Sequence, residues 1–146
     1  PQRSDCRITG VQLAAGSLDS ALSADLQHVL QRYQASIREL EMRGVQLDEA
    51  TLEVIAQLTE LEVLNLAESN LQDQSIPLLG RLPQLKHVDL PATGLSDDAV
   101  DDPIHACREL KELRSMHLRA TKISQPAARA LQRRLKGQQV AVRVLY

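Results

Sequence analysis

Four polar residues near the middle of the chain have the types and the spacing to do chemistry. His87 lies two positions before Asp89, and 28 residues later Ser115 lies two positions before His117. Imidazole and carboxylate groups are common metal ligands, so His87, Asp89 and His117 suggest a metal site. Ser115, His87 and Asp89 suggest instead a nucleophile, a base and the group that orients the base. The choice between these hypotheses depends on the elements that position the four side chains.

An apolar pattern that repeats along the chain determines where these residues lie. Each unit begins with an apolar residue and has further apolar residues two and seven positions later, as in Leu64, Leu66 and Leu71. The units begin at Val11, Leu40, Leu64, Val88 and Met116, and a terminal segment begins at Val140. The steps between them are 29, 24, 24, 28 and 24 residues. We therefore expect about five units and a terminal strand over residues 8 to 146.

Each unit is expected to form a short strand, a turn and a returning helix. Two apolar residues at a spacing of two put their side chains on one face of a strand, because strand side chains alternate. Apolar residues at helical spacing then follow, and the expected helices cover residues 48–58, 73–82 and 124–135. A longer helix is expected within residues 18–35, with Asp102 as the cap of another. Stacked units would bury their apolar faces in one shared core.

The repeat resembles the leucine-rich repeat family, whose unit is LxxLxLxxNxL, over nearly the whole chain. Where the commonest form of that unit has Asn, this chain has Gly16, Val45, Ser69, Thr93 and Thr121. It is similar to the bacterial Thr-type variety, LxxLxLxxTxLxDxxLxxL, and to the ribonuclease-inhibitor-like subtype. The resemblance implies an α/β fold, a right-handed solenoid with a parallel β-sheet on its concave side and helices on its convex side. The Ser and Thr hydroxyls are expected to bond the backbone of the turn in place of a continuous Asn ladder.

The strand pattern places one set of polar side chains on the concave face of the sheet. Neighbouring strands lie about 4.8 Å apart, so Asp89 is expected beside His117, and His87 beside Ser115. An open sheet has no oxyanion hole and does not exclude water, so a recognition surface is preferred to a metal site or a hydrolase. The expected contact residues are Glu39, Glu41, Asn65, His87, Asp89, His117, Arg119 and Arg143.

A non-catalytic protein-protein interaction module is the function that the resemblance implies, because leucine-rich repeats mostly bind proteins. The motifs CxxC, HExxH, GxxxxGK[ST] and GxGxxG do not occur, so no enzyme activity, cofactor or metal is expected. A structural or capping segment of a larger protein is the alternative. Contact of the basic run 129–136 with nucleic acid is a further hypothesis, opposed by the lack of aromatic residues to stack on bases.

Composition and charge agree with one globular domain over residues 1–146, with residues 1–35 as an N-terminal repeat and cap. The chain is 43% hydrophobic and 25% charged and contains no Phe or Trp, so its core must be aliphatic. No apolar run approaches the roughly 18 residues that a membrane span needs. Residues 39–73 hold nine acids and one base, and residues 113–146 hold eight bases and no acid. An acidic middle and a basic end are therefore expected.

The two ends of the stack and the two cysteines complete the expectations. The last strand would leave an open edge, to be covered by a further segment of a longer chain or by a second copy in a homodimer; the longer chain is preferred. The start at Pro1 also suggests a processed or excised piece. Cys6 and Cys107 fall too many units apart for a disulfide, and unpaired thiols favour a cytoplasmic compartment.

Overall fold

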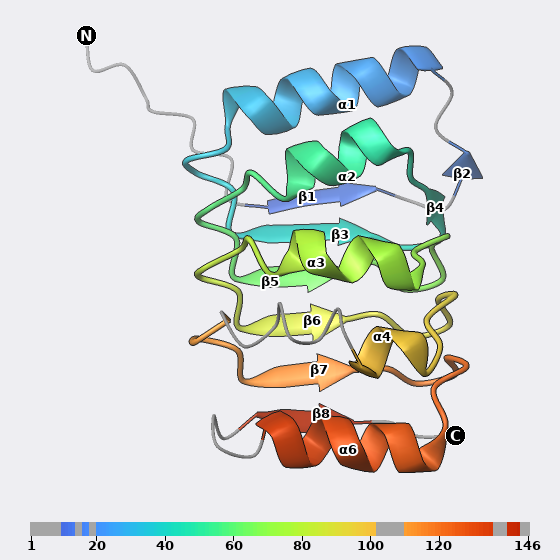
Figure 1. The fold of residues 1–146 in the computed structure, drawn as a ribbon. Helices are drawn as coiled ribbons and strands as arrows, with labels where there is room; N and C mark the ends of the chain where they lie inside the picture. The colour runs from blue at the N-terminus through green and yellow to red at the C-terminus, as the bar shows by residue number, and fades with distance from the viewer. Residues whose placement is uncertain (1–9, 14–15, 18–19, 102–109, 136–139, 144–146) are drawn as a thin grey trace, which may run out of the picture.

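A sheet of six parallel strands organises the part of the chain that the computed structural model describes, residues 10–13, 16–17, 20–101, 110–135 and 140–143. The spatial order of the strands is their order in the sequence (Figure 1). The strands are β1 (Gly10–Leu13), β3 (Glu39–Met42), β5 (Val63–Asn65), β6 (His87–Asp89), β7 (Ser115–His117) and β8 (Ala141–Arg143). Leu40, Leu64, Val88 and Met116 stand opposite one another in register. The predicted parallel sheet is confirmed.

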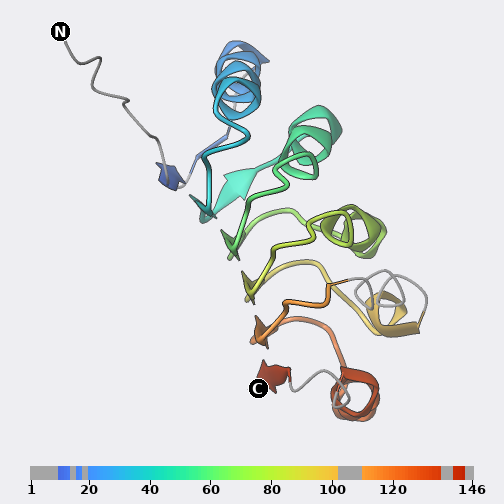
Figure 2. The same ribbon diagram turned by 90° about the vertical axis from the view of Figure 1, so that its left-hand side faces the viewer.

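Helices return the chain from the end of one strand to the start of the next. They are α1 (Ser20–Arg32), α2 (Glu49–Ile55), the 3₁₀ turn η1 (Asp73–Ser75), α3 (Ile76–Leu79), α4 (Asp98–Asp101) and α6 (Gln125–Leu135). Figure 2 shows all of these helices on one side of the curved stack and the strands of the sheet on the other. The predicted α/β solenoid, with its sheet on the concave side and its helices on the convex side, is confirmed.

Two expected helices are shorter than the sequence pattern indicated. The helix expected over residues 48–58 is α2, which ends at Ile55, and the second is shorter still. Residues 73–82 form the 3₁₀ turn η1 and then only the four residues of α3. Pro77 lies in the first turn of α3, where its missing N–H costs no intrahelical bond, and Gly80 follows as the cap. The helix expected after Asp102 lies outside the described residues, and α4 comes just before it.

The core is a single aliphatic cluster shared by all the coils. Leu40, Leu64 and Val88 are each 0% exposed and belong to that one cluster. Burying an aliphatic side chain of this size contributes about 1.5–3 kcal/mol. Because a coil on its own would leave these residues in water, each coil depends on its neighbours for stability.

Helices α1 and α2 are joined by a small polar network. The Asp48 side chain is the N-cap of α2: one of its oxygens accepts from the Thr51 backbone N–H at 2.7 Å, and the other from the Ser23 hydroxyl at 2.6 Å. Gln27 donates to the hydroxyls of both Ser23 and Thr51 at 3.1 Å. The hydrogen bonds from Ser23 and then Thr51 lower the pKa of Asp48 below its ordinary value. This network fixes the first long helix against the repeat that follows it.

The turn after each strand has the same backbone geometry in successive coils. Gly44, Glu68, Ala92 and Ala120 all have positive φ, at 67°, 58°, 55° and 57°. The N–H groups of Gly44, Glu68 and Ala92 each donate to a carbonyl oxygen of the next coil at 2.7–2.8 Å. Beyond this turn, β2 (Gly16–Ser17) pairs with β4 (Val45–Gln46) in a second short sheet. The left-handed residue therefore turns the chain and links neighbouring coils.

The expectation for the turn hydroxyls is right for threonine and wrong for serine. Thr93 and Thr121 donate to the carbonyl oxygens of Leu90 and Leu118 at 2.9 and 2.8 Å. The Ser69 hydroxyl is buried and has no hydrogen-bond partner among the described residues. The equivalent carbonyl, that of Leu66, accepts instead from the backbone N–H of Ser69 at 3.3 Å.

Asn70 supplies a link between coils that the sequence pattern did not indicate. Its Oδ1 accepts from the Leu47 N–H at 2.8 Å, and its Nδ2 donates to the Leu47 carbonyl at 3.0 Å. In the next coils, Asp73 accepts from the Ser96 N–H at 2.8 Å and Asp97 from the Ser124 N–H at 2.6 Å. Each of these side chains satisfies backbone of a neighbouring coil.

Candidate interaction surface

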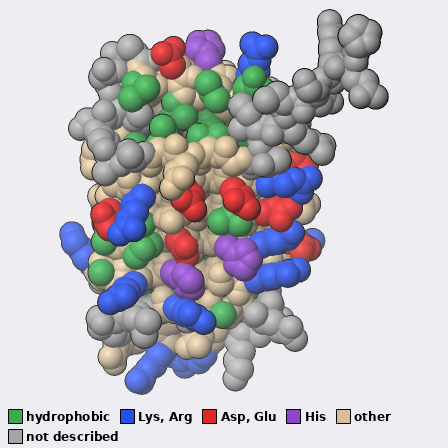
Figure 3. All heavy atoms as spheres, turned by 180° about the vertical axis from the view of Figure 1, so that it is seen from behind, with side chains coloured by type: hydrophobic (Ala, Val, Ile, Leu, Met, Phe, Trp, Pro, Cys, Tyr) green, Lys and Arg blue, Asp and Glu red, His purple; other side chains and the backbone are tan. Residues whose placement is uncertain are grey.

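Two rows of side chains cross the concave face of the sheet, one on each side of the central residues of the strands, which are buried in β3, β5, β6 and β7. The first row contains Gly10, Glu39, Val63, His87, Ser115 and Ala141. The second row contains Gln12, Glu41, Asn65, Asp89, His117 and Arg143. Seven of the eight residues expected at the surface lie in these rows, and Arg119 lies two positions beyond His117. In Figure 3, which shows this side, acidic side chains gather over the middle of the face and basic ones toward the β8 end.

Neighbouring strands bring four of these residues together in two pairs. Nδ1 of His117 lies 2.6 Å from Oδ1 of Asp89, and Nδ1 of His87 lies 2.8 Å from Oγ of Ser115. Both neighbour relationships agree with the expected register. Because Asp89 contacts His117 and not His87, the serine, its histidine and the aspartate are not arranged in series as a nucleophile, base and orienting group.

The hypothesis of a metal site at His87, Asp89 and His117 has no support in this geometry. Over the described ranges, no group of three or more His, Cys, Asp and Glu side chains is placed to hold a metal ion. The two histidines are held separately, one by a hydroxyl and the other by a carboxylate. A histidine whose Nδ1 has a hydrogen-bond partner has only Nε2 left for a ligand.

The acidic side chains on β3 and the basic ones toward the β8 end differ from the middle of the rows, because their charges have no partner among the described residues. Glu39 and Glu41 are exposed, and so are Arg119 and Arg143. Among the residues that the structure describes, these four side chains make no hydrogen bond or ion pair. Asn65, between the two ends, accepts from the Ala67 N–H at 3.0 Å, so its amide is oriented by the turn.

Charges along the edge of the same face, by contrast, are largely neutralised within the chain. Glu62 receives Arg38 from one neighbouring coil and Lys86 from the other, both at 2.7 Å. Lys86 and then Arg38 lower the pKa of Glu62 through these hydrogen bonds. Arg43 contacts Glu68 at 2.7 Å, which raises the pKa of the guanidinium. Glu39, Glu41, Arg119 and Arg143 therefore stay unpaired on a face where these edge charges are paired.

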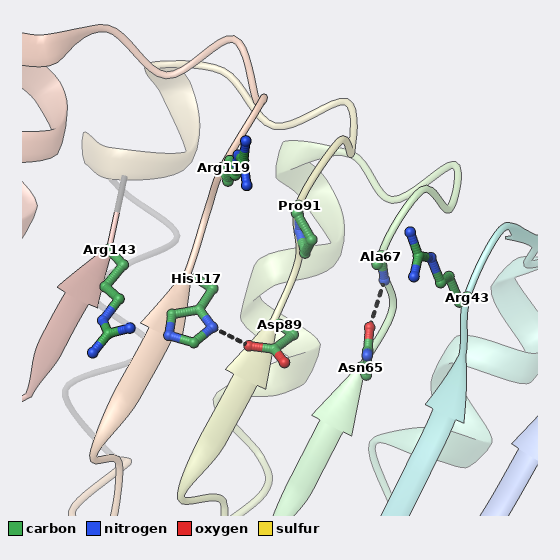
Figure 4. A pocket seen from close by; sticks show the side chains of 8 residues that line it. All are labelled: Arg43, Asn65, Ala67, Asp89, Pro91, His117, Arg119 and Arg143. Carbon is green, nitrogen blue, oxygen red and sulfur yellow. Dashed lines mark hydrogen bonds and ion pairs between the residues drawn. The ribbon is translucent and has the colours of Figure 1, made fainter. Parts of the chain in front are cut away.

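A hollow of about 300 Å³ opens beside the second row, toward the basic end (Figure 4). It is lined by Asn65, Asp89, His117 and Arg143 of that row and by Arg43, Ala67, Pro91 and Arg119. The latter four follow the second row by two positions in successive coils. Between the two arginines of this set, Ala67 and Pro91 are small, and their size leaves the space open. We refer to this feature as the basic hollow.

Comparisons with known proteins identify the fold. No family model matches the sequence, and no curated protein is significantly similar to it. A leucine-rich-repeat protein of Leptospira interrogans is similar in structure, with a TM-score of 0.58 and 21% identity over 80% of this chain. An internalin of Listeria monocytogenes is also similar, with a TM-score of 0.58 and 20% identity over 84% of this chain. This chain has the leucine-rich-repeat fold.

The leucine-rich-repeat solenoid described here is shorter than those two proteins. It spans 27% of the length of the Leptospira chain and 31% of that of the internalin. No helix within the described residues has the length and apolar character needed to cross a membrane.

Sequence reasoning found the strand positions of the solenoid's surface but missed three residues of the basic hollow. Arg43, Ala67 and Pro91 lie just beyond the strands, where the alternation of side chains no longer tells which way a residue points. Their common spacing of 24 residues, the period of the repeat, is the signal that identifies them.

The basic helix α6 lies on the convex side of the solenoid, away from these rows. Two of its arginines bond to backbone of the chain itself: Arg133 to the Arg129 carbonyl at 3.3 Å, and Arg134 to the Val100 carbonyl at 2.7 Å. Nucleic-acid contact would compete with these bonds. His28 is exposed on α1. Cys6, Cys107, His105 and Lys136 lie outside the described residues.

Proposed function

We propose that this chain is a non-catalytic protein-interaction module that binds its partner across the concave face of the solenoid. The observation that carries the proposal is the set of unpaired charges on β3 and toward the β8 end, on a face where the edge charges of Arg38, Glu62 and Lys86 are paired. The proposed contact residues are Glu39, Glu41, Asn65, His87, Asp89, His117, Arg119 and Arg143.

The shape and stiffness of the face support a macromolecular partner. Six strands at about 4.8 Å spacing make a strip about 24 Å wide, which is broad and open compared with an enclosed small-molecule site. Side chains mounted on a hydrogen-bonded sheet lose little freedom when they bind, because the backbone under them is already ordered. A rigid polar strip of this kind suits the surface of another protein.

The proposal that the module is not an enzyme is supported by the separation of its reactive groups. His87 with Ser115 and His117 with Asp89 form two pairs on an open sheet. Neither pair lies in a site that excludes water, so neither gains the electrostatic strength on which catalysis depends. We also infer the Thr-type subtype of the repeat, which the bonds of Thr93 and Thr121 support.

Site-specific photo-crosslinking tests which face carries the partner. A photoreactive amino acid at Val63, in the first row, is expected to crosslink to the partner. The same amino acid at Gln57, an exposed residue just after α2 on the convex side, is the matched control and is expected to give no crosslink. Crosslinks from position 57 alone, or equally from both positions, would refute a concave binding face.

A further inference from the structure

The basic hollow has the composition of a binding site for a negatively charged group. Arg143 stands beside His117 on the next strand, and Arg119 follows His117 by two positions. Both arginines line the hollow and neighbour His117, Arg143 across the strand pair and Arg119 along the chain. Their long side chains can both reach one group placed over His117.

The charge balance of the hollow leaves these two arginines available. Arg43 is already paired with Glu68 at 2.7 Å, and Asp89 with His117 at 2.6 Å. Neither Arg119 nor Arg143 has a hydrogen bond or ion pair in the described part of the chain. The hollow therefore has two guanidinium groups without a partner, while its one carboxylate already contacts His117.

The backbone carbonyl oxygens beside the hollow are already hydrogen-bonded within the chain. The carbonyl oxygens of Ala67, Pro91 and Arg119 accept the N–H groups of Gly44, Glu68 and Ala92 at 2.7–2.8 Å. The Arg143 carbonyl accepts from Leu118 at 3.0 Å. With these backbone oxygens engaged, a bound anion would meet the Ala67 and Pro91 side chains, the guanidinium groups and the Asp89 carboxylate, which already contacts His117.

We propose that the basic hollow binds an oxyanion, a carboxylate or phosphate group carried on a side chain of the protein partner. Guanidinium groups bind both anions through paired, charge-assisted hydrogen bonds. A volume of about 300 Å³ has room for such a group and part of the residue that carries it. The inference rests on the proposed function only for the statement that a protein partner carries the anion. The anion site itself is tested without any partner.

A protein fits the hollow better than a nucleic acid does. None of the residues that line it is a Phe, Tyr or Trp, on which a base would stack. Asp89 and Glu41 occupy the same row as Arg143, so a continuous phosphate backbone along that row would meet acidic side chains. A single acidic side chain over Arg119 and Arg143 avoids both.

The experiment follows the arginine Nε–Hε resonances by NMR during titration with inorganic phosphate, succinate or, at matched ionic strength, sodium chloride. Phosphate or succinate is expected to shift the Arg119 and Arg143 signals saturably, and chloride is not. Arg119→Gln and Arg143→Gln are each expected to weaken binding about tenfold or more, since each removes a charge-assisted hydrogen bond. Arg114→Gln, which changes an exposed arginine of the same coil, is the matched control and is expected to leave the affinity unchanged.

Each outcome bears on the inference separately from the proposed function. Saturable shifts with succinate alone would indicate that the hollow binds an Asp or Glu side chain of the partner. Saturable shifts with phosphate alone would indicate a phosphorylated side chain. Either result, or saturation by both anions, supports the site. Equal shifts at Arg114, or none at Arg119 and Arg143, would overturn it even if the concave face still captures a partner. Stronger binding of single-stranded DNA than of either anion would overturn the protein assignment.

Discussion

His117 and Asp89 stand side by side on neighbouring strands, with Nδ1 of the imidazole 2.6 Å from Oδ1 of the carboxylate. Both side chains are 37% exposed, so water screens the pair and limits its contribution to stability. The contact matters more for the orientation of the imidazole ring. It holds Nδ1 against the carboxylate and leaves Nε2 on the other side of the ring.

Removing this carboxylate should change the histidine without unfolding the protein. Asp89→Ala is expected to lower the free energy of unfolding by no more than about 1 kcal/mol, the range of exposed ion pairs. In ¹⁵N NMR, the neutral His117 ring of the parent protein is expected to carry its proton on Nδ1, and the variant to show a mixture with Nε2–H. An unchanged tautomer would mean that Asp89 does not orient the ring.

The left-handed turn residues predict stability changes of opposite sign. Ala92→Gly and Ala120→Gly should each raise the free energy of unfolding by about 0.5–1 kcal/mol, because glycine removes the strain of a positive φ at some cost in entropy. Gly44→Ala should lower it by about 1 kcal/mol. Ala128→Gly, in the helix α6, is the control and should destabilise by about 0.5–1 kcal/mol. Urea denaturation measures all four, and destabilisation by both turn glycines would contradict the turn geometry.

Protonation of Asp48 should lower the free energy of unfolding at acid pH. Its pKa is lowered in the folded protein, so its contribution is present above the unfolded pKa of about 3.9 and is lost as the pH falls through the folded value. Asp48→Asn keeps an N-cap side chain but removes the charge, and it should flatten the decline of stability below about pH 4.

Two further variants complete the test of Asp48. Asp48→Ala also removes the cap and should cost about 1 kcal/mol at neutral pH. Asp25→Asn changes an exposed acid of α1 and serves as the matched control. Thermal unfolding from pH 2 to pH 7 measures the effect, and an acid decline that Asp48→Asn leaves unaltered would assign it to other carboxylates.

Replacing Asn70, a residue outside the repeat pattern, should lower the free energy of unfolding. Asn70→Ala should cost about 1–2 kcal/mol, because both the N–H and the carbonyl of the buried Leu47 lose their partner. Gln72→Ala, which removes an amide with only a 3.4 Å bond, is the control and should cost less. Equal losses in chemical denaturation would argue against the Asn70 bridge.

The sequence was sufficient for the sheet but not for the details between coils. The two-residue spacing within each strand and the step of 24 residues predicted that Leu40, Leu64 and Val88 stack, because only one register buries all of them. The same register placed Asp89 beside His117. Residues after the strands follow no such alternation, so the bridge from Asn70 and the unsatisfied hydroxyl of Ser69 were not predictable. The basic hollow depends on small side chains between arginines, which a pattern of apolar residues does not encode.

The binding surface itself is tested most directly by reversing the free acidic charges of the rows. Glu39→Lys with Glu41→Lys changes two exposed side chains that make no hydrogen bond or ion pair within the described residues, so the unfolding curve should stay the same. Asp25→Lys with Glu112→Lys makes the same change in net charge at exposed positions outside the two rows. The measurement is the affinity of each variant for the partner identified by the Val63 crosslink. The account predicts that binding is lost only in the Glu39 and Glu41 variant, and equal affinity of the two variants would contradict it.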